Sequence, residues 1–188
     1  GASCTVISDL EPFEVRRLSY APSGLSYARP SLAVVEDEDF VAVETPAYRA
    51  RVSRASGVIA SLYDRAVERE LVGFGTPRPL SHTTVTRHDL ALGVFQLLEE
   101  SPNPMAAWQV AEIRRETSLL RADSVELVTT GPDGAEIEVV HRFGASSICE
   151  TITFTAALPR VDFAVTVDWQ EVGSAEAGVP HLKLAFAG

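Results

Sequence analysis

The chain has 188 residues and a mass of 20.3 kDa, which is enough for one domain with a substantial core but too short for a (β/α)8 barrel of about 250 residues. Its 46% apolar and 22% charged residues are typical of a soluble globular protein and argue against a disordered chain. Lysine and arginine total 16 against 26 aspartates and glutamates, so a formal charge of −10 argues against nucleic acid and anionic membrane as partners.

The N-terminal region contains neither the pattern of a signal peptide nor a run of about 18 apolar residues, so we expect no leader and no membrane span. A start without Met suggests that the chain is a fragment of a longer protein. Cys4 and Cys149 are the only cysteines, and their positions predict two free thiols rather than a disulfide. With no glycosylation sequon, these features predict a cytoplasmic bacterial protein.

The first half of the chain predicts a lead-in segment followed by strands. We expect the lead-in over residues 1–33 and a single sandwich domain over residues 34–188. Apolar residues alternate in three segments, of which the last two are joined by a tight connection at residues 54–57 and predict a hairpin: Phe40–Val43, Ala47–Ser53 and Val58–Tyr63. Residues 73–79 carry two glycines and two prolines, which predict a long loop.

The segment Pro104–Asp123 is ambiguous. Its content of Ala, Glu, Arg and Leu favours a helix, but its apolar residues form no sustained stripe, so helical and non-helical structure both stay open.

The second half of the chain shows the clearest period of two. Gly131–Gly134 predicts a turn between two strands of a hairpin, and further strands follow it. The expected strands are Val125–Thr129, Ala135–Phe143, Ser147–Thr155, Val161–Gln170 and His181–Phe186. About ten short strands with turns between them predict an all-β fold, a large antiparallel β-sandwich.

The histidines do not predict a metal site. The four histidines are His82, His88, His141 and His181, and none of their spacings is typical of zinc ligands. A cluster of His82, His88 and Asp89 is conceivable, but exposed loop histidines explain the same pattern. His141 falls on the apolar face of its strand, where a hydrogen-bonded core histidine is the simpler interpretation. No GxSxG motif and no glycine-rich phosphate loop occurs, so hydrolysis by a serine nucleophile of that kind and nucleotide chemistry through a phosphate loop are not predicted. No catalytic residue is assigned in this chain.

Two tryptophans provide the candidate carbohydrate contacts. Asp168 and Glu171 flank Trp169, and carboxylates beside an aromatic ring are suited to holding a sugar, although Trp169 could equally be a core residue. Trp108 follows a proline-rich loop that contains Asn103, where its ring could either stack on a sugar or fill a gap beneath the loop.

Several segments together resemble one family, the α-mannosidases of glycoside hydrolase family 38, in their C-terminal β-domain. The resemblance covers about residues 34–186 and rests on the order of segments that match the family. These segments are residues 44–72, the acidic and proline-rich stretch 97–110 that contains Ala106-Ala107-Trp108, the turn Thr130-Gly131-Pro132, the strands Pro159-Arg160-Val161-Asp162-Phe163 and Val167-Asp168-Trp169-Gln170-Glu171, and Leu182-Lys183-Leu184-Ala185-Phe186. One departure is Ala106, which stands where the family usually has Asp, so a role of this loop in the sugar site is in question.

The resemblance implies a non-catalytic domain. In the family, the nucleophilic Asp, the acid/base carboxylate and the zinc ligands belong to an N-terminal catalytic domain, so this fragment is expected to lack zinc and hydrolytic turnover. It is also expected to fold as a supersandwich similar to galactose mutarotase. The implied partners are the catalytic domain of the parent enzyme and, through that enzyme, an α-mannoside.

Two other functions stay open. One is a self-contained aldose epimerase or mutarotase-like enzyme, with His141 and Glu171 or His88 and Glu99 as the reactive pair. The other is a carbohydrate-binding module that presents Trp108.

Overall fold

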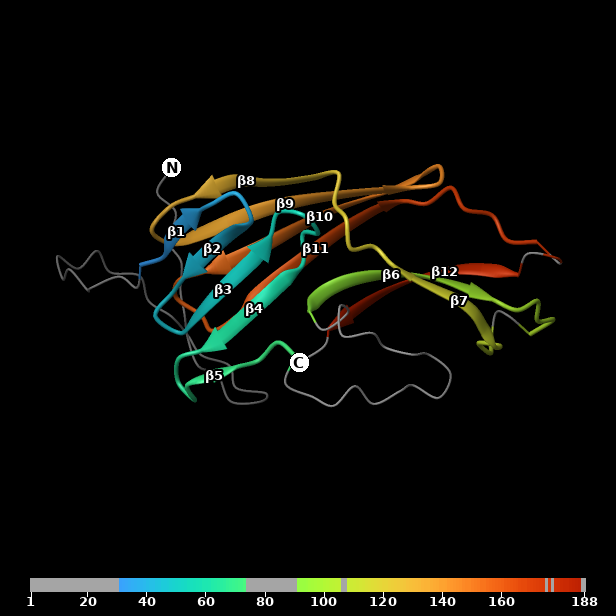
Figure 1. Cartoon of the computed structure of the whole chain (residues 1–188), viewed down its shortest axis with the longest axis horizontal. Helices are drawn as coiled ribbons and strands as arrows, with labels where there is room; N and C mark the ends of the chain where they lie inside the picture. The colour runs from blue at the N-terminus through green and yellow to red at the C-terminus, as the bar shows by residue number, and fades with distance from the viewer. Residues whose placement is uncertain (1–30, 74–90, 106–107, 175, 177, 187–188) are drawn as a thin grey trace, which may run out of the picture.

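The protein is a two-layer structure of β-strands, seen in a computed structural model that describes residues 31–73, 91–105, 108–174, 176 and 178–186 (Figure 1). Within these residues the secondary structure consists of twelve strands, with no helix. No helix long and apolar enough to cross a membrane occurs in these ranges. The predicted all-β class is confirmed. The boundary between residues 1–33 and 34–188 stays a prediction, since residues 1–30 lie outside the described part.

The strands form two antiparallel sheets. The larger sheet contains β1 (Ala33–Glu36), β2 (Phe40–Glu44), β3 (Tyr48–Ser53), β4 (Ile59–Asp64), β5 (Arg69–Glu70), β6 (Leu92–Glu100), β7 (Ile113–Ser118) and β12 (Val179–Phe186). Its order is β1-β2-β3-β4-β6-β12, with β5 paired to β4 and β7 paired to β6. The smaller sheet contains β8 (Ser124–Thr130), β9 (Gly134–Phe143), β10 (Ser146–Thr155) and β11 (Val161–Asp168), in the order β11-β10-β9-β8.

Both predicted hairpins are present. β3 and β4 are joined through Gly57, whose φ of 75° is accessible to glycine without strain, and β8 and β9 are joined by the turn at Gly131. The segment Pro104–Asp123 is not helical in its described part, because residues 113–118 form β7 and pair with β6. Cross-strand hydrogen bonds to β6 therefore override the helix propensity of this segment.

The core lies between β2–β4 of the larger sheet and β8–β10 of the smaller one. Alternate residues of β3, β9 and β10 are buried, as expected for strands with one face toward a core. The buried side chains that make up this core are Val41, Val43, Tyr48, Ala50, Val52, Ile59, Val125, Ile137, Val139, Ile152 and Phe154. The period-two pattern of the sequence therefore specifies which face of each strand is packed.

The strands β6, β7 and β12 extend away from this core as a three-stranded arm (Figure 1). The arm joins the rest of its sheet through a single pairing, Ile59 with Leu92. Next to this junction Gly93 has a φ of 82°, and a Cβ atom at Gly93 would lie 3.1 Å from the Phe163 ring of the opposite sheet. The sheet therefore bends away beside β11, and the arm carries the β6–β7 loop to the far end of the molecule.

We predict that Gly57→Ala destabilises the fold. A Cβ atom at Gly57 would lie 2.2 Å from Cγ1 of the buried Val139, and the positive φ adds backbone strain. The two effects together should lower the free energy of unfolding by about 2–4 kcal/mol, measured by urea denaturation. The matched control is Gly131→Ala, because a Cβ atom there meets nothing within 4 Å. Equal losses from the two substitutions would contradict this account of Gly57.

Candidate functional site

The β6–β7 loop presents Trp108 to solvent. The loop is closed at its base by the Ser101 amide, which donates to the Glu112 carbonyl over 2.8 Å. Asn103 contacts both sides of the loop, since Oδ1 accepts from the Met105 amide at 2.9 Å and Nδ2 donates to the Gln109 carbonyl at 3.1 Å. Trp108 is 83% exposed. The interpretation of Trp108 as a gap filler is therefore wrong, and its ring is free to stack.

A buried carboxylate anchors the loop. Glu100, at the end of β6, is fully buried, and its Oε1 accepts from the Ala111 amide at 2.5 Å. Its Oε2 is in hydrogen-bond contact with Nε2 of His181 on β12. The Ala111 amide, followed by His181, holds the pKa of Glu100 below its ordinary value despite the burial. An ionised Glu100 thus links β6, the returning end of the loop and β12.

A hollow of about 580 Å³ adjoins this loop. Pro102, Asn103 and Pro104 line it from the loop side, and residues from the segment that precedes and begins β12, among them Gly173 and Val179, line it from the other. Asn103 is thereby placed next to the segment that follows Glu171, although its polar atoms are engaged within the loop.

The other two predicted carbohydrate contacts have local structural roles. Oε1 of Glu171 accepts from the Ala145 amide at 3.1 Å and from the Ser146 hydroxyl at 3.0 Å, so it holds the β9–β10 turn. Asp168 accepts from the Gln170 side chain at 2.5 Å. Between them the half-buried Trp169 packs against Phe143, with ring centroids 5.8 Å apart. The structure gives no sign that these residues share a sugar surface with Trp108.

His141 does not form an exposed acid/base site. His141 is buried on the inner face of β9, its Nδ1 contacts the Arg121 carbonyl at 3.1 Å, and its ring lies against Phe95. Burial lowers the pKa of His141, so it is a core histidine as predicted. His141 is closed to a substrate, and Glu171 is committed to a turn. His82 and His88 lie outside the described residues.

The side chains described do not fit a zinc ion. Within the described ranges no group of three His, Cys, Asp or Glu residues is close enough to bind a metal. Cys149, the one cysteine in these ranges, is a free thiol, whereas Cys4 lies outside them. No chemical step through a metal is therefore assigned to this part of the chain.

Glu150 is a buried acid that the sequence analysis missed. It lies on the inner face of β10 between Ile148 and Ile152, and its Oε1 is buried without a hydrogen-bond partner. Burial raises its pKa to about 7. The sequence could have predicted this buried acid, because Glu150 stands among the apolar, inward-facing positions of a strand with regular alternation. No comparable signal marks Glu100, whose partners come from distant segments.

The family model for the glycosyl hydrolases family 38 C-terminal domain matches residues 43–187. The chain belongs to this family. No curated protein matches the chain. Membership of family 38 supports a non-catalytic domain of a family 38 glycosidase. Ala106, at which the sequence departs from the family pattern, lies outside the described residues.

We predict that Glu100→Ala loosens the β6–β7 loop. The Ala111 amide and His181 both lose their acceptor, so the loop should become more mobile while the core stays folded. In a Trp169→Phe background, the steady-state fluorescence anisotropy of Trp108 should fall. In the Trp169→Phe variant that keeps Glu100, the anisotropy of Trp108 should also fall as the pH drops through the lowered pKa of Glu100. The reason is that the ionised form of Glu100 makes these contacts.

The matched control for Glu100→Ala is Glu99→Ala. Glu99 forms only an exposed ion pair with Arg115, so its removal should leave the anisotropy unchanged. An unchanged signal in Glu100→Ala would show that the loop is held by other contacts.

We predict that Glu150 makes the fold less stable as the pH rises. Because its pKa is about 7 in the folded protein and near 4.5 when unfolded, the unfolded chain releases this proton first. Stability is therefore retained below pH 4.5 and falls by about 3 kcal/mol in total as the pH rises to about 7. Glu150→Gln should remove this loss, so the difference between variant and parent in urea denaturation should grow between pH 5 and 7. If the difference in the free energy of unfolding between Glu150→Gln and the parent did not change with pH, the raised pKa of Glu150 would be refuted. An equal change from Glu126→Gln, at an exposed glutamate, would refute it as well.

Proposed function

We propose that this domain is the non-catalytic partner of the catalytic domain in an enzyme that hydrolyses α-mannosides. Hydrolysis would take place in that catalytic domain, with retention and with zinc bound there. Family membership supports the glycosidase part of this proposal. The domain would supply a rigid β-sandwich and one edge of the sugar cleft.

The observation that carries this role is the exposed Trp108. An indole ring that is 83% exposed on a soluble domain is available for stacking on the apolar face of a sugar ring. After Trp108 the chain is held by Asn103, which donates to the Gln109 carbonyl, and by Glu100, which accepts from the Ala111 amide, so the ring lies next to a segment with fixed contacts. The adjoining hollow of about 580 Å³ offers space for a sugar residue beside the loop.

Of the alternatives, a carbohydrate-binding module is favoured by the same exposed ring. A mutarotase-like enzyme that uses His141 and Glu171 is not favoured, because buried His141 cannot reach a sugar and Glu171 holds a turn. The pair of His88 with Glu99 stays a prediction, because His88 lies outside the described residues. The two sugar-binding roles differ in affinity. A cleft-edging loop should bind a sugar weakly by itself, whereas a module should be retained on immobilised mannan.

We predict that α-methyl mannoside and mannan quench the fluorescence of Trp108. Saturable quenching should persist in Trp169→Phe and disappear in Trp108→Ala, because only the exposed ring reaches the sugar. The chain should retain no activity on a chromogenic α-mannoside and should bind no stoichiometric zinc in a calorimetric titration. Turnover by this chain would overturn the non-catalytic assignment, and absence of quenching would remove the sugar-contact role.

A further inference from the structure

The open side of the sandwich lies along β11, the edge strand of the four-stranded sheet. Among the residues that the structure describes, β11 pairs only with β10, so its other edge has backbone N–H and C=O groups without strand partners. Its register with β10 is regular over all eight residues, from Ser147 with Asp168 to Phe154 with Val161. β11 therefore offers an edge without a bulge to an incoming strand.

The inner face of β11 is only partly covered. Val165 and Val167 lie opposite Glu150 and Ile148 of β10, which are buried, so both valines point toward the interior. They are nevertheless 39% and 38% exposed. On the facing arm, Phe186 is 55% exposed. The apolar interior thus reaches solvent between β11 and the arm.

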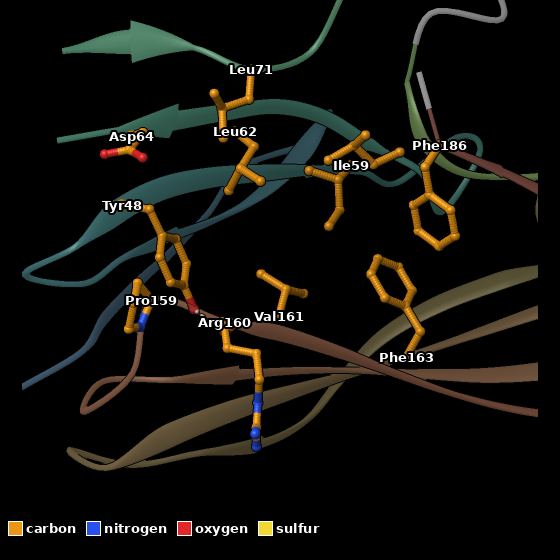
Figure 2. A pocket seen from close by; sticks show the side chains of 11 residues that line it. Tyr48, Ile59, Leu62, Asp64, Leu71, Pro159, Arg160, Val161, Phe163 and Phe186 are labelled. Carbon is orange, nitrogen blue, oxygen red and sulfur yellow. Dashed lines mark hydrogen bonds between the residues drawn. The ribbon is translucent and has the colours of Figure 1, made fainter. Parts of the chain in front are cut away.

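A pocket of about 460 Å³ lies at the beginning of this edge, between β4 and β11 (Figure 2). Its walls are mainly apolar, and Figure 2 shows the rings of Phe163 and Phe186 facing one another at one end, with centroids 5.2 Å apart. At the other end the Tyr48 hydroxyl donates to the Arg160 carbonyl at 3.1 Å. The volume of the pocket is sufficient for a large apolar side chain from a strand that runs along β11.

The other edges of the described sheets carry features that discourage strand addition. β1 has four residues, β7 contains adjacent arginines, β8 is interrupted by a bulge after Leu127, and β12 contains Pro180 and Lys183. Short strands, charges, bulges and prolines are the usual protection of sheet edges. β11 has none of these along its length except a terminal aspartate pair, Asp162 and Asp168.

Charge decides which strand fits. Antiparallel pairing of two β11 strands about Val165 would place Asp162 of each copy opposite Asp168 of the other, which is unfavourable. The outward face of this sheet also carries three glutamates, Glu126, Glu136 and Glu138, against Arg142. Arg160, just before β11, pairs with Asp162 at 2.9 Å, so Asp168 carries the larger share of the unbalanced charge at this edge. A second copy, with its net charge of −10, is therefore a poor occupant, and a basic strand is a good one.

We infer that β11 is a strand-addition site for an extended polypeptide that alternates apolar with basic side chains. The apolar side chains enter the gap over Val165 and Val167, and the basic side chains lie over Asp162 and Asp168. Main-chain hydrogen bonds to β11 supply affinity, and the alternation sets the register. This inference goes beyond the proposed function, because it requires neither a sugar nor a catalytic activity.

The test uses a labelled nine-residue peptide in which valine alternates with lysine and threonine. We expect saturable binding by fluorescence anisotropy, with new protection of β11 amides in hydrogen exchange. A peptide with glutamate in place of lysine should bind at least about tenfold more weakly, and a peptide with alternate N-methylated amides should not bind. Equal binding of the N-methylated peptide would overturn the inference, as would protection of the outer β11 amides in the chain alone.

Two variants locate the site. Val165→Lys places a charge on the inner edge and should weaken binding about tenfold, whereas Val128→Lys, at the bulge of the opposite edge strand, should bind like the parent. Asp168→Lys changes only an exposed residue and should reverse the preference between the lysine and glutamate peptides. Two results would contradict the proposed occupant. One is a parent chain that sediments as a dimer and becomes monomeric in Val165→Lys. The other is an Asp168→Lys variant that still prefers the lysine peptide over the glutamate peptide.

Discussion

Every other feature of this domain depends on the contact between alternate side chains of β2–β4 and β8–β10. Every second side chain of β9 and β10 faces the other sheet. Four of these side chains are fully buried there: Ile137, Val139, Ile152 and Phe154. A shift of register by one residue would turn this whole set toward solvent, so the pairing of the strands is strongly specified. The close approach of Gly57 to Val139 shows that the hairpin turns are fitted to the same interface.

The departure of the arm from this interface explains two features that otherwise look unrelated. Since β6 meets β4 only at the pairing of Ile59 with Leu92, the arm diverges from the four-stranded sheet beyond that point. This divergence leaves Val165 and Val167 without a full apolar covering. It also carries the β6–β7 loop, with the exposed Trp108, away from the main core (Figure 1). Within the described residues, the β6–β7 loop and the edge of β11 are therefore two separate surfaces.

Two buried glutamates show how hydrogen bonding and burial compete. Glu100 accepts from a backbone amide and contacts His181, so donors outweigh burial and its pKa is lowered. Glu150 has no donor at Oε1 and is surrounded by aliphatic side chains, so burial dominates and its pKa rises. The first acid anchors a loop, whereas the second makes the core sensitive to pH. Similar residues at similar burial thus have opposite electrostatic behaviour, according to their neighbours.

The sequence alone determined the strands with regular alternation, both hairpins and the two-layer class, because period and turn chemistry are local properties. The family followed from the resemblance of ordered segments to family 38. It also placed Trp108 in a loop and His141 in the core. Only the tertiary structure decided that residues 113–118 form a strand, since pairing with β6 outweighs local propensity there. The same holds for the contact of Glu100 with His181, 81 positions apart, and for the open edge of β11. These features depend on which distant segments meet, and no local pattern encodes that meeting.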